Sequence, residues 1–475
     1  ARRQARDGRR RLVAGSRPVN AKHGAGTTGR AAPARKVAAE VLAAVRDDDA
    51  YANLLLPARI AQAKLSLGDA ALATELTYGT LRMQGRYDRI IRLAANRETS
   101  AIDPVVLDVL RLGVHQLVAT RIPPHAAVGD TVALAPRRAT GFVNGVLRSV
   151  SRSTPEEWDA RLLEGLNGDT RLAAEYSHPE WVVDALRRAL DADGRADELE
   201  ELLAADNFAP AVSLVALPGL VSVAEVGEPG GIAPTGVQAV GGDPAAVPAV
   251  AAGTARVQDE GSQLAALILS RARPITAGER WLDMCAGPGG KAALLAAEAR
   301  LGGAELVANE LVPVRAKLVR RALAVFDPAP RVVEGDATRF ATSDAGGFDR
   351  ILLDAPCTGL GALRRRPEAR WRKQPADIPG LVALQTRLLD AAVAALAPGG
   401  LLAYVTCSPH PDETRAAVAR VLKRHPGLSA VDTRAVAADI ATSDLGPGVG
   451  PAVQLWPHRH GTDAMFVQLL SKVDA

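Results

Sequence analysis

The sequence predicts an α/β protein in which a doubly wound sheet fills the C-terminal part of the chain. Short apolar runs alternate with helical segments from residue 261 to residue 475, and this alternation is typical of such sheets. Residues 35–154 show helical apolar spacing without strand signals, which predicts an all-α domain. Residues 155–260 mix both patterns, and we expect them to form a small α/β subdomain that links the other two.

The first part of the chain, residues 1–34, is a basic tail with Asp7 as its lone acid. Such a segment cannot bury apolar surface, so we expect it to be disordered. Its positive charge fits an arm that binds nucleic acid. A leader without any role explains the same composition, and the sequence does not separate these two interpretations.

The all-α domain is predicted from apolar side chains that recur with a helical period. Val37, Val41, Leu42 and Val45 fall on one helix face. Further segments of this kind, which together predict five to seven helices, cover residues 54–60, 70–81, 87–95, 104–120 and 141–150.

The small subdomain begins with helical stretches at residues 156–166 and 182–190, and short apolar runs follow at 212–217 and 220–226. His178 lies between the two helical stretches, beside a proline. A single histidine of this kind more often packs structurally than binds a metal, so we expect no metal site.

The doubly wound domain is predicted element by element. Buried strands are expected at residues 280–284, 304–309, 332–334, 350–353, 401–406 and 464–470. Helices are expected at residues 263–270, 291–299, 314–324, 378–396 and 412–424. In a parallel sheet, the residues just past each strand gather at the edge where such sheets bind their ligands.

Cysteine usage and apolar runs indicate where the protein resides. Only 3 cysteines occur in 475 residues, which favours a reducing, cytoplasmic setting where a cysteine is either catalytic or buried. The longest charge-free run, residues 391–411, is interrupted by Pro398-Gly399-Gly400. That pattern predicts a helix end, a turn and a strand instead of a membrane span. We expect a monomer without contact to a membrane.

A glycine-rich turn follows the first strand of the doubly wound domain. It consists of Cys285, Ala286, Gly287, Pro288, Gly289, Gly290 and Lys291. Glycines let the backbone approach a ligand, and the N–H groups of the following helix point toward it. Pro288 departs from the dinucleotide fingerprint, so the turn does not favour NAD. We expect the Cys285 side chain to pack while its backbone lines the cofactor.

Acidic residues end the next two strands. Glu310 follows the glycines by about twenty residues, a spacing that suits a ribose diol. Asp336 can accept a hydrogen bond from an adenine amino group. Each acid alone is explained as a solvated strand end. Together with the glycine turn they favour an adenosine-containing cofactor without a pyrophosphate, which is S-adenosylmethionine.

Cys357 and Cys407 follow two separate strands. A buried cysteine is commonly an inert apolar side chain, but two at one ligand edge are much less expected by chance. A thiolate that adds to C6 of cytosine makes C5 able to accept a methyl group. Asp354 is placed to orient the cytosine and to stabilise this adduct near N3 and N4. The chemistry of the residues alone does not decide which thiol attacks.

A basic segment follows Cys357 and surrounds a tryptophan. We expect Arg365, Arg366, Arg370 and Trp371 to bind RNA by holding phosphates beside an unstacked target base. A solvated basic loop without a ligand is the alternative.

The motifs around the two cysteines resemble those of a known enzyme family. Asp354-Ala355-Pro356-Cys357-Thr358-Gly359 and Thr406-Cys407-Ser408-Pro409 are similar to the paired motifs of the Sun/Nop family of RNA 5-methylcytosine methyltransferases. The glycine turn resembles the cofactor loop of that family. Residues 75–82 and 142–148 resemble the NusB-type RNA-binding domain. The combination is similar to the bacterial small-subunit ribosomal RNA methyltransferase B type.

This resemblance implies a Rossmann-like class I methyltransferase domain after a NusB-like RNA-binding domain, with a middle subdomain that also binds RNA. The implied reaction is methylation of C5 of a cytosine in RNA, with small-subunit (16S) ribosomal RNA as the substrate. Cys407 is then the nucleophile that adds to C6, and Cys357 assists breakdown of the adduct. Cofactor contacts are implied at residues 285–291, Glu310, Asp336 and Asp354.

Three alternatives stay open on the sequence. The substrate could be another RNA, such as tRNA. A DNA cytosine methyltransferase would instead attack with Cys357. An RNA-binding factor in ribosome assembly could keep the fold without catalysing a reaction.

Overall fold

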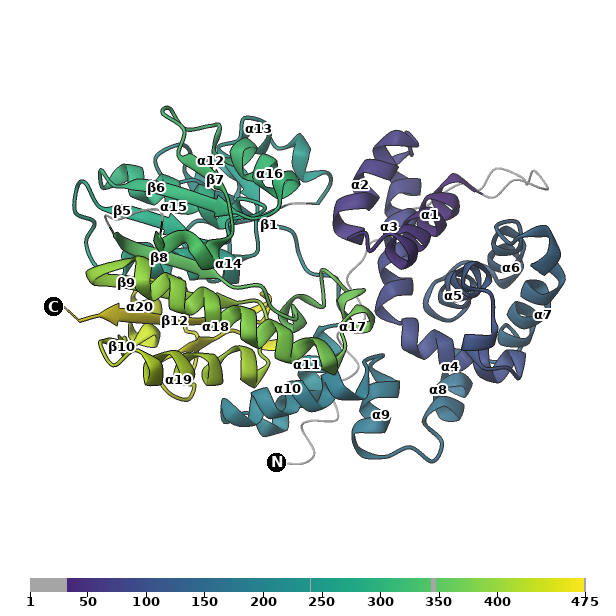
Figure 1. Ribbon diagram of the computed structural model, residues 1–475. Helices are drawn as coiled ribbons and strands as arrows, with labels where there is room; N and C mark the ends of the chain where they lie inside the picture. Colours follow the sequence, from purple (N-terminus) through teal and green to yellow (C-terminus); the bar gives the residue numbers. More distant parts are fainter. Residues whose placement is uncertain (1–31, 240, 343–346, 474–475) are drawn as a thin grey trace.

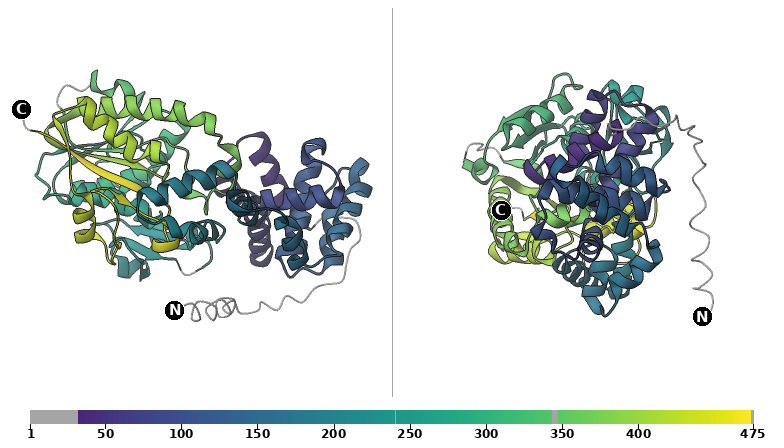
Figure 2. Two further views of the ribbon diagram at one scale, coloured as in Figure 1. Left: turned by 90° about the horizontal axis from the view of Figure 1, so that it is seen from below. Right: turned by 90° about the vertical axis from the view of Figure 1, so that its right-hand side faces the viewer.

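A computed structural model describes residues 32–239, 241–342 and 347–473 of the chain. A helical domain lies beside an α/β domain (Figure 1), and the side-by-side arrangement is also clear from below (Figure 2). The predicted basic tail lies outside the described residues except at its end. There Pro33 and Ala34 already belong to the first helix, which moves the predicted start of the helical domain back by two residues.

The N-terminal domain is helical, as predicted. Its helices are α1 (Pro33–Asp47), α2 (Ala52–Gln62), α3 (Leu67–Arg82), α4 (Gln84–Ala95), α5 (Pro104–Ala119), α6 (Pro124–Val132) and α7 (Thr140–Val150). Helix α5 contacts α1, α3, α4, α6 and α7. Because α5 has neighbours on several sides, apolar side chains occur all around this helix, and Leu110, Leu112 and Val114 are fully buried.

The core of the helical domain continues past residue 154. Helix α8 (Pro155–Leu163) begins with a capping box between Thr154 and Glu157, which satisfies free N–H groups of its first turn. Trp158 and Leu162 of α8 are buried in the helical core, and the Trp158 indole donates to Val150 O at 3.0 Å. The first helix of the middle region therefore packs with the preceding domain.

The rest of the middle region packs against the α/β domain. Its helices are α9 (Gly168–Glu175), α10 (Glu180–Ala192) and α11 (Leu199–Ala205), and the last two bury apolar residues against Leu360, Leu363 and Trp456. A small antiparallel sheet in the order β2-β3-β1-β4 follows. Its strands are β1 (Ser213–Ala216), β2 (Glu228–Pro229), β3 (Gly236–Gln238) and β4 (Ala255–Val257).

His178 in this region is buried. Burial lowers the pKa of its ring to about 4, so the ring is neutral near pH 7. No group of three or more potential metal ligands occurs in the described part of the chain. The His178 Nε2 lies 3.5 Å from Asp206 Oδ2.

The α/β domain contains a sheet in the order β10-β12-β9-β8-β5-β6-β7. Its strands are β5 (Arg280–Asp283), β6 (Glu305–Glu310), β7 (Arg331–Glu334), β8 (Phe348–Asp354), β9 (Leu396–Thr406), β10 (Leu428–Ala430) and β12 (Phe466–Lys472). Strands β5 to β9 pair in parallel. The carboxyl ends of β9, β8, β5, β6 and β7 therefore lie in that order along one edge.

Helices cover both faces of this sheet, which confirms the doubly wound architecture. Helices α14 (Glu260–Arg271), α15 (Gly290–Leu301), α16 (Pro313–Leu323) and α20 (Thr433–Ile440) pack on one face. Helices α18 (Ile378–Ala395) and α19 (Arg415–Arg424) pack on the other. Neighbouring strand residues alternate between the two cores, as Ile351 and Leu352 do.

The sheet is mixed, whereas the alternation of strands and helices indicated a parallel one. Strand β12 runs antiparallel to β9, while β10 and β11 (Val453–Gln454) run antiparallel to β12. The apolar pattern that predicts a buried strand carries no information on its direction. Strands β10 and β11 were not predicted, because they are too short to show a periodic pattern.

One segment in the described residues, Pro375–Ala395, is long and apolar enough to cross a membrane by length and composition. It includes α18, whose Leu388, Leu389 and Ala392 are buried against the sheet. The core helix of an α/β domain meets the same criteria.

Candidate active site

The structure brings Cys357 and Cys407 together at the edge of the sheet. Cys357 follows β8 and Cys407 follows β9, and these strands are parallel neighbours. Their Sγ atoms are 3.5 Å apart, within hydrogen-bonding distance. Backbone bonds hold both turns, because Ala355 N–H donates to Val405 O at 2.8 Å and Gly361 N–H donates to Cys407 O at 2.9 Å. Both sulfur atoms can therefore face one ligand.

The surroundings of the two thiols differ. The hydrogen bond between the two thiols lowers the pKa of Cys407, against burial and the charge of Asp354, and the positive charges of Arg366 and Lys291 add to the lowering. The same hydrogen bond, together with burial and the nearby carboxylate of Glu413, raises the pKa of Cys357 well above its usual value. These opposite directions favour Cys407 as the thiol that ionises first, while the contact itself allows either sulfur to donate.

An ion pair stands beside the thiols. Lys291 at the start of α15 donates to Asp354 at the end of β8, with 2.9 Å between Nζ and Oδ2. Although burial alone would lower the pKa of Lys291, the charge of Asp354 raises it. The lysine is therefore a cation that holds the Asp354 carboxylate in place.

The glycine-rich turn is held tightly between two strands and a helix. Gly287 N–H donates to Glu310 Oε2 at 2.9 Å, and Ala286 N–H donates to Asn309 O at 2.9 Å. Gly289 has φ of 106°, and a Cβ there would lie 2.6 Å from Ala322 on α16. Only glycine fits this position, because the backbone is left-handed and the helix is in contact.

The remaining members of the turn sit as the sequence suggested. Pro288 and Gly290 complete the turn, and Gly290 is the first residue of α15. Burial raises the pKa of Cys285 far above its usual value. This thiol stays protonated, which agrees with a packing role for its side chain.

Four carboxylates end neighbouring strands along the edge: Asp354 on β8, Asp283 on β5, Glu310 on β6 and Asp336 just past β7. Glu310 is buried and accepts hydrogen bonds from the backbone of Gly287 and Val312. Asp336 is about half exposed, and its Oδ1 accepts from the Thr338 N–H and hydroxyl. The sequence-predicted acids therefore line one edge in strand order.

Asp283 was missed by the sequence analysis. Its side chain is buried, and neither carboxylate oxygen has a hydrogen-bond partner. Burial, with the nearby charge of Asp354, raises its pKa to about 7. A buried acceptor without a partner is costly, so this carboxylate fits a ligand that supplies a cation or N–H donors. The signal in the sequence was an acid at the end of an otherwise apolar strand.

The structure corrects the predicted RNA contact of Arg370, while that of Trp371 stays a prediction. Arg370 is fully buried, and its guanidinium donates to the backbone oxygens of Arg82, Ser177 and Asp206. The Trp371 ring packs so closely on Gly85 of α4 that a Cβ there would lie 2.3 Å from it. Both side chains join the α/β domain to the helical domain, and Arg370 has no free surface for RNA, whereas Trp371 is partly exposed.

Arg365 and Arg366 lie near enough to Cys407 to interact with it electrostatically, and they differ in exposure. Arg365 forms an ion pair with the buried Asp463, with 3.0 Å between Nε and Oδ1. Arg366 is exposed, and its guanidinium lies 5.2 Å from the centre of the Tyr51 ring. Tyr51 comes from the helical domain, so a basic and an aromatic side chain from two domains meet beside the thiols.

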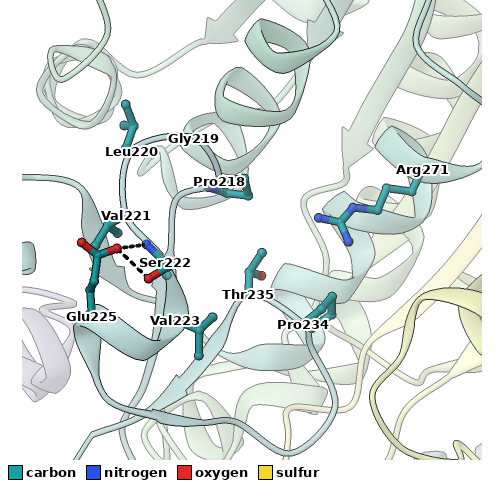
Figure 3. A pocket seen from close by; sticks show the side chains of 11 residues that line it. Pro218, Gly219, Leu220, Val221, Ser222, Val223, Glu225, Pro234, Thr235 and Arg271 are labelled. Atoms are coloured by element: carbon teal, nitrogen blue, oxygen red, sulfur yellow. Dashed lines mark hydrogen bonds between the residues drawn. The ribbon is translucent and has the colours of Figure 1, made fainter.

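A separate surface pocket lies on the small antiparallel sheet (Figure 3). Its polar side chains are already engaged: Ser222 with Glu225, and Arg271 with Glu298. None of the residues that line it belongs to the edge that carries the thiols, and it plays no part in the site described here.

Comparisons with known proteins agree with this architecture. A family model described as 16S rRNA methyltransferase RsmB/F matches residues 273–471, and a NusB family model matches residues 32–152. A protein of Mycobacterium tuberculosis named as a methyltransferase is 48% identical over 452 residues, which cover 93% of this chain and 97% of that protein. The ribosomal RNA small subunit methyltransferase B of Pseudomonas putida is 35% identical, with 84% and 91% covered.

Among solved structures, the crystal structure of PH0851 is similar with a TM-score of 0.76. It is 22% identical, and the match covers 94% of this chain and 100% of that one. A likeness at this identity supports the fold.

Proposed function

The chain belongs to the RsmB/F family of 16S rRNA methyltransferases, and from this premise we propose that it methylates C5 of a cytosine in small-subunit ribosomal RNA. It is an S-adenosylmethionine-dependent RNA methyltransferase. The observation that carries the finer proposal is the pair of thiols, 3.5 Å apart, at the cofactor edge of the sheet. We place the reaction in the cytoplasm and assign it to a monomer.

The residues at the edge fit S-adenosylmethionine, which supplies an electrophilic methyl group on a sulfonium. The unpartnered carboxylate of Asp283 would hold the ammonium of the methionine part. Glu310 keeps free lone pairs beside its two backbone bonds and would accept from the ribose hydroxyls. Asp336, one strand further, would accept from the adenine amino group.

Cys407 is the proposed nucleophile. Its thiolate forms an S–C6 bond to the cytosine, and the electron pair of the C5–C6 double bond makes C5 nucleophilic. Asp354, held by Lys291 at 2.9 Å, orients the ring near N3 and N4 and stabilises the adduct. C5 then takes up the methyl group, and S-adenosylhomocysteine is left.

Cys357 is the proposed helper in breakdown of the adduct. The C5 proton leaves to solvent, the C5–C6 double bond forms again, and the S–C6 bond breaks. The Cys357 S–H donates to the departing Cys407 sulfur, which restores the hydrogen bond seen in the structure. The neutral state of Cys357 supports this role, since only a protonated thiol can donate.

The target cytosine has to be unstacked to reach this edge. Single-stranded or loop RNA meets that need at the lowest cost. The exposed Arg366 and the Tyr51 ring beside it offer a phosphate contact and a stacking surface at the entrance. The helical domain, which supplies Tyr51, thus takes part in binding the substrate.

The division of labour between the thiols is tested by single substitutions. Cys407→Ala should abolish methyl transfer. Cys357→Ala should trap a covalent protein–RNA adduct, which appears as a shifted band in a denaturing gel. Cys285→Ala is the matched control, since its thiol is inert, and should retain transfer without an adduct. Equal, adduct-free loss in Cys407→Ala and Cys357→Ala would refute the assignment.

The substrate is tested separately. Tritium release from C5-labelled cytosine should occur with 16S rRNA and not with matched DNA or tRNA. Bisulfite sequencing of ribosomal RNA from a deletion strain should show one cytosine that has lost its methyl group. A wild-type protein that binds RNA but no cofactor in calorimetry would instead be an assembly factor.

A further inference from the structure

A buried carboxylate lies next to the two thiols and has no part in the mechanism so far. Glu413 is in a short turn, Pro411–Glu413, that follows Cys407, and its side chain is 0% exposed. Its oxygens accept from Thr358 N–H at 2.9 Å, from the Thr358 hydroxyl at 2.5 Å and from Gln385 Nε2 at 3.2 Å. These donors are neutral, so the charge of Glu413 is held by dipoles alone.

The contacts of Glu413 tie the two cysteine turns to each other. Thr358 is the neighbour of Cys357 in the chain, and its Oγ1 lies 2.9 Å from Oγ of Ser408, the neighbour of Cys407. Since the Thr358 hydroxyl donates to Glu413, the Ser408 hydroxyl donates to Thr358. One chain of hydrogen bonds therefore runs from Glu413 through the residue after Cys357 to the residue after Cys407.

Two further bonds anchor this chain. Gln385 of α18 donates to Pro356 O at 2.9 Å, which fixes the residue before Cys357 as well. The Tyr404 hydroxyl donates to Glu413 O at 2.7 Å and secures the turn to β9. Buried hydrogen bonds that share partners hold one another's geometry, and here only Gln385 Oε1 among the side-chain atoms of this hydrogen-bond chain has no partner. The 3.5 Å spacing of the sulfurs is thus determined by contacts that converge on one carboxylate.

The charges around the two thiols also differ. Glu413 and Asp354 contribute to raising the pKa of Cys357, after the hydrogen bond with Cys407, burial and the charge of Cys407. Asp354 also raises the pKa of Cys407, but Arg366 and Lys291 lower it. Two carboxylates act on one sulfur, while two cations offset one carboxylate at the other, and this difference favours a single placement of the shared proton.

We propose that Glu413 is a positioning residue that keeps the proton on Cys357 and aims its S–H at Cys407, so that one thiol attacks and the other releases the adduct. The role of Glu413 in catalysis rests on the proposed function. Its effect on the two thiols, which is to keep their pKa values unequal, applies equally to the protein without RNA. An experiment can therefore contradict either claim without contradicting the other.

Glu413→Gln removes the charge and keeps most of the contacts. Its amide oxygen can still accept from Thr358 N–H, while its NH₂ group faces the Thr358 hydroxyl. Alkylation of each thiol by iodoacetamide is followed against pH in the RNA-free protein, with peptide mass spectrometry to separate Cys357 from Cys407. We expect Cys357 to be alkylated about tenfold faster at a given pH, which corresponds to a pKa lowered by about one unit.

The same variant should lower kcat, leave the KM for RNA unchanged and accumulate the covalent adduct, because a Cys357 S–H that is no longer held toward Cys407 donates poorly to the leaving sulfur. Glu298→Gln is the control for loss of a buried carboxylate. Glu298 is buried, accepts from Ser270 and Arg271, and has no contact with the thiol turns. It should leave the labelling of both cysteines unchanged.

A folded Glu413→Gln protein whose Cys357 labels as in the wild type would overturn the proposal. If that variant does not fold, Thr358→Val decides, since it breaks the chain of hydrogen bonds and keeps the charge. We expect it to accumulate adduct without a shift in the labelling profile, and unchanged single-turnover release would overturn the proposal. A wild-type protein with unequal thiols but no cytosine methylation would refute the function instead.

Discussion

Four carboxylates end neighbouring strands of the sheet, and their oxygens differ in how well they are satisfied. Asp354 has a lysine, Glu310 has two backbone N–H groups and Asp336 has the N–H and hydroxyl of one threonine. Asp283 has no partner and is buried. The free energy of cofactor binding is therefore expected to depend most on Asp283. Its carboxylate is already removed from water without a partner, and a donor on the ligand would satisfy it.

The pH dependence of cofactor binding follows from the pKa of Asp283, which burial raises to about 7. The ammonium of the cofactor binds the ionised form, so the affinity should fall as pH drops through 7. Between pH 8 and pH 6 the ionised fraction falls about tenfold, and the Kd measured by calorimetry should rise by that factor.

Asp283→Asn should weaken binding at pH 8 and remove this pH dependence. Asp336→Asn is the matched control. The Thr338 side-chain hydrogen bond lowers the pKa of Asp336, so that carboxylate stays ionised over this range. Its variant should bind more weakly but keep the pH dependence, and a flat profile in both variants would contradict the assignment to Asp283.

At the level of single residues, the sequence identified groups with a motif and missed those without one. The two thiols, the glycine turn and Glu310 are recognisable from spacing. Asp283 is an ordinary acid in a strand, and only its lack of a partner in the fold marks it. The segment around Arg370 has the composition of an RNA contact, but composition does not tell which side of a segment faces solvent.

The glycine turn is the element where packing and cofactor binding depend on one backbone conformation. Gly289→Ala would place a Cβ 2.6 Å from Ala322 in left-handed backbone. We expect a loss of about 2 kcal/mol or more in the free energy of unfolding, measured by urea denaturation, and a weaker affinity for the cofactor.

Gly380→Ala provides the comparison. Gly380 lies in α18 with no atom within 4 Å of the added Cβ, and alanine is the better helix former by about 1 kcal/mol. This variant should be neutral or more stable. A Gly289→Ala protein with wild-type stability would show that the turn can move away from α16.

Element existence was easier to predict than element direction. Long apolar runs in β8 and β9 gave clear strands, and the helices between them were found within a few residues. The antiparallel direction of β12 depends on the strand with which it pairs, and this pairing is determined by tertiary contacts that the local sequence does not encode. Leu428–Ala430 has one buried residue followed by two exposed ones, which is no pattern at all.

At the scale of the whole molecule, the segment 360–373 joins the catalytic edge to the helical domain. Arg370 donates to carbonyls from α3, the turn after α9 and the end of α11. Arg372 reaches Val45 O and Ala50 O at 3.3 and 2.9 Å. The contacts between the domains thus depend on arginines such as Arg370, which the sequence pattern had assigned to RNA.

Arg370 and Arg366 should therefore give opposite signatures when replaced by alanine. Arg370→Ala leaves several buried acceptors unpaired and should cost about 3 kcal/mol. Faster proteolysis between the domains should accompany this loss. The Kd for S-adenosylmethionine should stay unchanged, because the cofactor edge is built by other residues.

Arg366→Ala should keep the unfolding free energy within about 0.5 kcal/mol. Its affinity for RNA should fall, and the slope of log K against log salt should decrease by about 1. Binding titrations at several salt concentrations measure both. The reverse outcome, with Arg366→Ala unstable and Arg370→Ala defective only in RNA binding, would contradict these placements.

The close packing of Trp371 on Gly85 limits which substitutions the two positions can accept. A side chain larger than hydrogen at position 85 would displace the indole, and a smaller ring at position 371 would leave a void beside α4. A tolerated change on one side thus demands a compensating change on the other, in stretches of the gene far apart. Relatives should therefore carry matching residues at these two positions. Chimaeras that combine halves from distant species should lose the packing between positions 85 and 371 before other contacts.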